Sequence, residues 1–183
     1  MADIRIDLTG LDDLAKACKN LGTNRQRMIE VCIKELAARL LRKVIKRTPV
    51  GVPPNNISKE IKDKYWKGYV GGTLRRGWTA KSEEEAKSGN VPDIVVYLNG
   101  VQVEHNGNSF SINIINPVHY ASYVEYGHRQ TPGRFAPALG KRLKKSFVEG
   151  QYMLKISENE LRGQAPAIVQ KKIEKYLKGA FDG

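Results

Sequence analysis

Apolar positions in the first 50 residues follow two different periods. Residues 3–8 alternate between apolar and charged side chains, which predicts a half-buried strand. Apolar residues then recur every three or four positions. This spacing predicts a short helix over residues 11–22 and a longer one that starts at Thr23 or Asn24. The longer helix should end at Thr48, because Pro49 pushes the preceding residue out of the helical region.

Between Pro49 and Gly72 the periodicity is lost, apart from a brief helical turn expected within residues 57–66. A connection of this length is typical of a functional or mobile segment, since most loops have about four to six residues. Lysines alternate here with aromatic residues. A loop of this kind could contact DNA or a neighbouring subunit through Lys59, Lys62, Lys64, Tyr65, Trp66, Lys67 and Arg76. The pattern equally allows solvated lysines, with the aromatic rings folded back onto the core.

The second half of the chain predicts a mixture of short strands and helices. Strands are expected at 73–80, 94–98, 101–105 and 110–115. Asn99-Gly100 is a strong hairpin signal between two of them, and a second turn is expected at residues 106–108, so the last three strands should form a meander. Helices are expected at 119–126, closed by Gly127, then between residues 135 and 147, and at 165–180.

These elements predict an α+β fold. We expect a single antiparallel β-sheet with long helices packed on one face, and a long basic loop between the first long helix and the sheet. The expected organisation is one domain over residues 1–150 and a C-terminal helical extension over 151–183. Both cysteines, Cys18 and Cys32, fall at apolar helical positions, so buried free thiols are expected.

Charge adds one functional hint. The chain has 31 Lys and Arg against 19 Asp and Glu, a formal charge of +12. Such a balance favours contact with a polyanion, which could be nucleic acid, an acidic protein surface or an anionic membrane face. The sequence has no apolar run long enough to span a membrane and no secretion signal, so we expect a cytoplasmic protein without membrane contact.

The sequence offers no pattern of catalytic or ligand-binding residues. Its three histidines form no metal-binding spacing, and nucleophile-elbow and phosphate-loop motifs are missing. The acidic run Glu83–Glu85 is expected in a solvated loop, not at a metal. We therefore predict no cofactor, no metal and no enzymatic activity.

Two segments resemble a known family. Gly72-Thr73-Leu74-Arg75-Arg76-Gly77-Trp78 is followed downstream by Tyr120-Ala121-Ser122-Tyr123-Val124-Glu125-Tyr126-Gly127 and then by Phe135-Ala136-Pro137-Ala138. In this order they resemble the tail-completion or head–tail joining family of tailed phages and prophages. The motif residues that match are Thr73, Leu74, Arg75, Tyr120, Ala121, Val124, Glu125, Gly127, Phe135 and Pro137. The family's usual V-D-T-G is replaced by a long insertion at residues 51–71, and the tail from about residue 150 lies beyond its pattern.

The resemblance implies a structural virion protein that forms a ring, expected to be a hexamer, in the neck or at the tail end. Its implied partners are copies of itself, connector or portal-side proteins and tail-tube proteins, with transient contact to DNA. Such a protein would reside in the virion, after assembly in the bacterial cytoplasm. The competing interpretation is a basic nucleic-acid-binding module without catalytic activity.

Apart from the resemblance, packing accounts for most of these motif residues. Glu125 is the exception, since it lies between two aromatic residues. We expect it to pair with an arginine such as Arg75 or Arg134, within or between subunits. We also expect its replacement by alanine to cost about 0.5 kcal/mol, as at a surface site, and yet to reduce the number of finished particles, because Glu125 should matter for assembly more than for folding.

Overall fold

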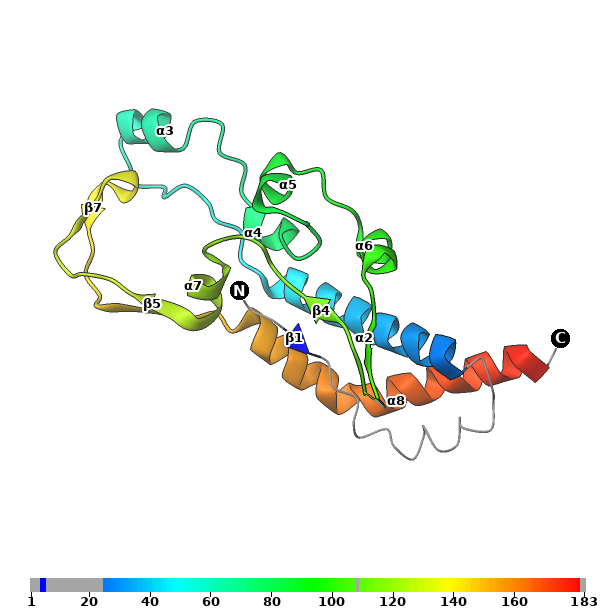
Figure 1. The fold of residues 1–183 in the computed structure, drawn as a ribbon. Helices are drawn as coiled ribbons and strands as arrows, with labels where there is room; N and C mark the ends of the chain where they lie inside the picture. Colours follow the sequence, from blue (N-terminus) through cyan, green and yellow to red (C-terminus); the bar gives the residue numbers. More distant parts are fainter. Residues whose placement is uncertain (1–3, 6–24, 108, 182–183) are drawn as a thin grey trace. The chain divides into compact units, whose positions relative to one another are not determined.

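The computed structural model describes residues 4–5, 25–107 and 109–181 (Figure 1). The chain divides into two compact units. Unit 1 contains residues 47–91 and 116–153, and unit 2 contains residues 2–46, 92–115 and 154–183. The division expected from the sequence, with a domain over residues 1–150 and an extension over 151–183, stays a prediction.

Unit 2 is built mainly from two long helices. They are α2 (Arg25–Arg47) and α8 (Met153–Phe181), whose first residue belongs to unit 1. The shorter elements are α6 (Ile94–Gly100), β1 (Ile4–Arg5), β2 (Glu104–Asn106), β3 (Ser109–Ser111) and β4 (Asn113–Ile114). Strand β1 pairs with β4, and β2 pairs with β3, both antiparallel.

Helices α2 and α8 lie side by side and antiparallel (Figure 1). Lys43 bonds Glu160 at 3.0 Å, and Lys172 lies 3.6 Å from Glu35, which fixes their relative direction. Each helix also buries an apolar stripe. The buried apolar residues are Met28, Cys32, Ile33, Leu36, Ala37, Ala38, Leu40, Leu41 and Val44 on α2, and Met153, Leu154, Leu161, Val169 and Ile173 on α8. Because partly exposed ion pairs contribute little, burial of these stripes provides most of the stabilisation.

Unit 1 consists of short elements. Its helices are α3 (Lys59–Tyr65), α4 (Thr73–Arg76), α5 (Glu83–Ser88), α7 (Ala121–Tyr126) and the 3-10 turn η3 (Pro137–Leu139). Its strands are β5 (Gly127–Arg129), β6 (Phe135–Ala136), β7 (Lys141–Arg142) and β8 (Phe147–Glu149). Strand β5 pairs with β8 and β6 with β7, so residues 127–149 form one long hairpin with its tip at η3.

The α+β class is confirmed, but the expected single sheet is wrong. The described strands form four separate two-stranded antiparallel pairs. Several predicted helices are present: α2 ends before Pro49, α3 occupies part of the basic loop, and α7 is closed by Gly127. The predicted strand over residues 3–8 is described only at Ile4–Arg5, and the helix predicted over 11–22 lies outside the described residues, as does Cys18. Cys32 is buried in α2, as expected.

Two predicted strands are helices instead. The segment expected as a strand over 73–80 begins with α4, and the one over 94–98 is α6. In α6 the Asp93 carboxylate accepts hydrogen bonds from the backbone N–H groups of Val95 (2.8 Å) and Val96 (3.0 Å). This cap outweighs the strand preference of the β-branched run. Asn99-Gly100 ends this helix and makes no hairpin, so the meander is reduced to the β2–β3 hairpin and β4.

The helix expected over residues 135–147 is also wrong, because this segment is part of the long hairpin. A spacing of four places side chains on one side of a strand as well as of a helix, so the apolar pattern was ambiguous. Gly140 decides between them, since its left-handed backbone (φ 63°) turns the chain at the hairpin tip. The last helix was predicted correctly over 165–180 but begins earlier, at Met153. None of the helices in the described ranges combines the length and apolar character that crossing a bilayer requires.

Candidate functional site

The first motif segment is attached to Thr48, the residue that follows α2. Thr48 is fully buried, and its carbonyl oxygen accepts hydrogen bonds from Arg75 Nε (3.0 Å) and Nη2 (2.7 Å). Its hydroxyl oxygen accepts a further bond, at 2.7 Å, from the indole N–H of Trp78, which is 2% exposed. The arginine and tryptophan of the motif therefore hold the chain where the long helix ends.

Replacing Thr48 by valine should lower the free energy of unfolding by about 1–3 kcal/mol, because the buried Trp78 N–H loses its acceptor. Thr48→Ser is the matched control, since it keeps the hydroxyl and removes only a methyl group. Urea denaturation of both variants measures the difference. Equal losses would show that the hydroxyl contributes nothing.

A second set of bonds joins this motif segment to residues 116–118. The Asn116 side-chain amide donates to the carbonyl oxygen of Leu74 at 2.9 Å, and its oxygen accepts from Val118 N at 3.2 Å. Gly77 makes this approach possible, because a Cβ at that position would overlap the Asn116 side-chain oxygen. The two motif segments are thus parts of one packed structure.

Arg76 is also used inside unit 1. Its Nε donates to the carbonyl oxygen of Ala86 at 2.8 Å, and its Nη1 donates to that of Gly71 at 3.0 Å. Sequence reasoning grouped Arg76 with the loop residues that could contact DNA or a neighbour. In the structure it ties α4 to α5 and to the end of the basic loop, and the acceptors of both these bonds are backbone carbonyls.

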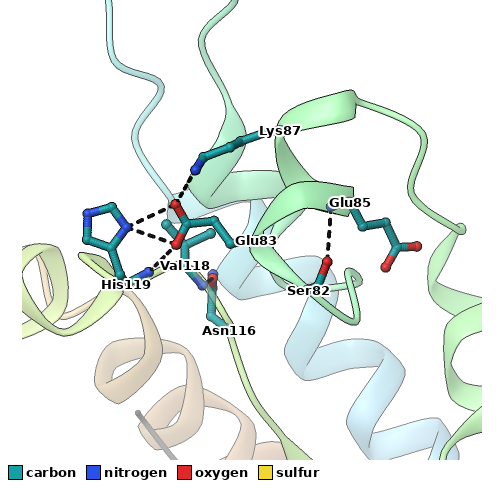
Figure 2. Close-up of polar contacts among 7 residues, drawn as sticks. All are labelled: Ser82, Glu83, Glu85, Lys87, Asn116, Val118 and His119. Carbon is teal, nitrogen blue, oxygen red and sulfur yellow. Dashed lines mark hydrogen bonds and ion pairs between the residues drawn. The ribbon is translucent and has the colours of Figure 1, made fainter.

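Figure 2 shows a polar network between α5 and the segment that leads to α7. The Glu83 carboxylate accepts bonds from the His119 backbone N–H (2.9 Å) and from Lys87 Nζ (2.6 Å), and lies 2.8 Å from His119 Nδ1. Ser82 caps α5 by accepting from Glu85 N at 3.2 Å. The acidic run expected in a solvated loop is therefore the first turn of a helix, where carboxylates are favoured. The hydrogen bond from Lys87, followed by that from the His119 backbone, lowers the pKa of Glu83 to about 2.

This network predicts a pH dependence. The folded-state pKa of Glu83 is lowered from 4.5 to about 2, so its stabilising contribution is fully present above about pH 4.5 and is lost as the pH falls towards 2. The difference in urea midpoint between the wild type and Glu83→Gln should therefore shrink across this window. In a Lys87→Gln background the pH range over which this difference shrinks should be narrower, because Glu83 has lost the hydrogen bond that lowers its pKa most. A difference that stays constant from pH 6 to 2.5 would contradict this assignment.

The second motif segment forms α7 and the base of the hairpin. Ala121 is buried, and the backbone carbonyls of Val124 and Glu125 accept bonds from Gln151 N (2.8 Å) and Tyr152 N (3.0 Å). Gly127 has φ 85° and ψ 175°, a conformation that is almost restricted to glycine. These contacts fix where the hairpin leaves the rest of unit 1.

Glu125 differs from the expectation for a surface residue. Its side chain is 2% exposed, and within the described chain neither Arg75 nor Arg134 forms an ion pair with it. The expected surface position is therefore wrong. Because removing a buried, partnered carboxylate costs more than a surface change, Glu125→Ala should cost more than about 0.5 kcal/mol. The expected role of Glu125 in assembly stays a prediction.

The remaining motif residues lie in a part of unit 1 that we name the basic arm, residues 58–69 and 128–147. Helix α3 contacts the hairpin tip: Trp66 Nε1 donates to the Ala138 carbonyl oxygen at 2.8 Å, and the rings of Trp66 and Tyr69 meet edge to face. A Cβ on Gly140 would come within 2.7 Å of Ile61 Cδ1. The loop is thus folded against the hairpin, while Phe135, at 51% exposure, and Pro137 remain at the surface.

The loop residues predicted from the sequence fall into two groups. Trp66 bonds to the hairpin tip, which agrees with the alternative that aromatic rings of the loop fold back onto the protein. The exposed ones are Lys59, Lys62, Lys64, Tyr65 and Lys67. The sequence pattern did not identify the other half of the arm, because residues 135–147 were expected to form a helix. This half contains Lys141, Arg142, Lys144 and Lys145. Among the described residues no group of three or more His, Cys, Asp or Glu side chains is arranged to hold a metal ion.

Comparison with known proteins shows the family to which the chain belongs. Searches of curated proteins and of solved structures gave no significant match. A family model for the HK97-gp10-like tail component of bacteriophages matches residues 12–127, well over half of the chain. The matched range contains Thr48 with Arg75 and Trp78, the motif segments at residues 72–78 and 120–127, and the polar network around Glu83. The chain therefore belongs to the HK97-gp10-like family and is a structural protein of a phage tail.

Proposed function

We propose that this chain is a ring-forming subunit at the junction of phage head and tail or at the tail end, acting in tail completion and not as an enzyme. The observation that carries the proposal is the family match over residues 12–127. The ring is a closed homo-oligomer, a hexamer, which contacts connector or portal-side proteins and tail-tube proteins. Its place is the virion, in the neck or tail, after assembly in the host cytoplasm.

Exposed apolar side chains support a role in assembly. Tyr123 and Tyr126 on α7 are 58% and 53% exposed, on either side of the buried Glu125. Val95 and Val96 on α6 are 57% and 58% exposed. The sheets that the described residues form have two strands each, so further strand edges are available for pairing. Contact with further copies in a closed ring would cover such edges and side chains.

The competing function is a nucleic-acid-binding module without catalytic activity. One observation favours it, the concentration of exposed cations on the basic arm. A ring subunit with a basic arm accounts for this observation as well as for the family match, so we prefer the structural role.

A nonsense mutation in the gene, tested in the phage that encodes it, examines the proposal. Electron microscopy of the lysate should show filled heads and tails that have not joined, or tails of irregular length, and expression of the chain from a plasmid should restore particles. A lysate with a normal number of infectious particles would contradict the proposal.

A further inference from the structure

The basic arm is one physical surface made from two distant segments. Bonds from Gln130 N to Ser146 O (2.9 Å), Gly133 N to Leu143 O (2.9 Å) and Leu143 N to Arg134 O (2.8 Å) continue the hairpin between its two strand pairs. Helix α3 is held on its tip by the Trp66 bond to Ala138. The arm is therefore folded within the single chain, and its hydrogen bonds hold the hairpin and α3 in one arrangement.

Charge is concentrated on this arm. It contains ten Lys and Arg side chains against two acidic ones, so +8 of the chain's formal charge of +12 lies on it. The hairpin part, residues 128–147, has no Asp or Glu. The ten cations are Lys59, Lys62, Lys64, Lys67, Arg129, Arg134, Lys141, Arg142, Lys144 and Lys145.

All ten are exposed. Within the described part of the chain, none has a carboxylate at ion-pair distance. Two make other contacts: Arg142 Nη1 donates to the Gly133 carbonyl oxygen at 2.7 Å, and Lys64 Nζ lies 5.4 Å from the Tyr65 ring centre. Uncompensated like charges repel one another, so the arm gains stability when an external polyanion neutralises it.

We infer that the basic arm binds duplex DNA through its phosphates, without reading the base sequence. Two features favour DNA over an acidic protein. Seven of the ten cations are lysines, a residue that is depleted in protein–protein interfaces. The ten cations also lie on both sides of the hairpin and on or just after α3, and a two-stranded ribbon has the width that a major groove accepts.

This inference rests on the proposed function for its biological setting, since a ring at the head–tail junction surrounds the path of the genome. It deepens that function by assigning the DNA contact to named residues. The aromatic side chains exposed on the arm, Tyr65, Tyr69, Phe135 and Phe147, lie among the cations and would pack against sugars or groove walls.

Fluorescence anisotropy of the full chain with a 30-base-pair duplex of arbitrary sequence tests the inference. Two variants each remove three arm charges: Lys141→Gln with Lys144→Gln and Lys145→Gln, and Lys59→Gln with Lys62→Gln and Lys67→Gln. The matched control removes three exposed lysines of unit 2: Lys46→Gln with Lys171→Gln and Lys175→Gln. Lys64 and Arg142 are kept because of their contacts within the arm.

The wild type should bind with a dissociation constant of about 10⁻⁴–10⁻⁶ M or tighter near physiological salt, independently of sequence. Each arm variant should weaken binding at least about tenfold at 100 mM salt and reduce the slope of log K against log salt by about 2–3. The control should change affinity by less than about threefold, and thermal melting should show that all three variants fold.

Three results would overturn the inference. They are no binding at 50 mM salt, an equal loss in the control variant, and unchanged DNA binding in arm variants that fail to enter particles. The last result would mean that the arm docks on a protein. Because binding is measured on the isolated chain, its failure would leave the ring proposal standing. Conversely, normal particles without this chain would contradict the ring proposal alone.

Discussion

Replacing Gly127 by alanine is expected to lower the free energy of unfolding by about 2–4 kcal/mol. The φ and ψ of Gly127, 85° and 175°, lie in a region where a side chain costs about 1–3 kcal/mol. An added Cβ would also overlap the Val148 carbonyl oxygen and come within 2.8 Å of Gly150 N. These are backbone atoms held by the β5–β8 pairing, so they cannot move aside cheaply.

Gly133→Ala is the matched control for this substitution. Gly133 also has a positive φ, 82°, but an added Cβ would meet nothing within 4 Å. Gly133→Ala should therefore lower the free energy of unfolding only by the cost of a left-handed backbone with a side chain, about 1–2 kcal/mol. Chemical denaturation of both variants measures the difference. Equal losses would show that the close approach at the base of the arm is not rigid.

Replacing Leu161 by alanine should cost about 2–5 kcal/mol, because its side chain is 4% exposed and its removal leaves a cavity. Ile156→Ala lies on the same helix at 43% exposure and should stay within about 0.5 kcal/mol. Urea denaturation of the two variants separates burial from helix propensity, and similar small effects would contradict the packing described for α8.

The Leu161 result bears on the limits of the family match. Helix α8 lies outside the matched residues 12–127, yet its ion pairs reach Glu35 and Lys43 on α2, inside the match. If Leu161→Ala lowers the free energy of unfolding as expected, the C-terminal helix is part of the same folded structure as α2. If it is not, the helix behaves as the extension predicted from residue 151 onward.

Local signals predicted those parts of the fold that depend on local physics. Helix α2 has a sustained apolar stripe and ends before Pro49, and α7 ends at a glycine with positive φ. Helix α6 was mistaken for a strand because the β-branched run dominated, although Asp93 immediately before it was a readable capping signal. The hairpin between residues 128 and 147 was mistaken for a helix because a spacing of four suits both structures.

Contacts between distant residues could not be predicted. Thr48 and Trp78 are 30 positions apart, Glu83 and His119 are 36 apart, and Trp66 and Ala138 are 72 apart. The sequence motifs identified the family segments, yet most of the motif residues make packing contacts and hydrogen bonds inside unit 1. The surface with the clearest charge, the basic arm, emerges only when two segments that looked unrelated are brought together.

We propose that this chain forms a ring in the tail or neck of a phage particle. Single-particle electron microscopy of purified virions, combined with quantitative mass spectrometry of the same sample, tests it most directly. We expect a closed ring of six copies at the tail end or head–tail junction, with about six chains per particle by mass spectrometry. Purified infectious virions that contain one copy of the chain, or none, would contradict it.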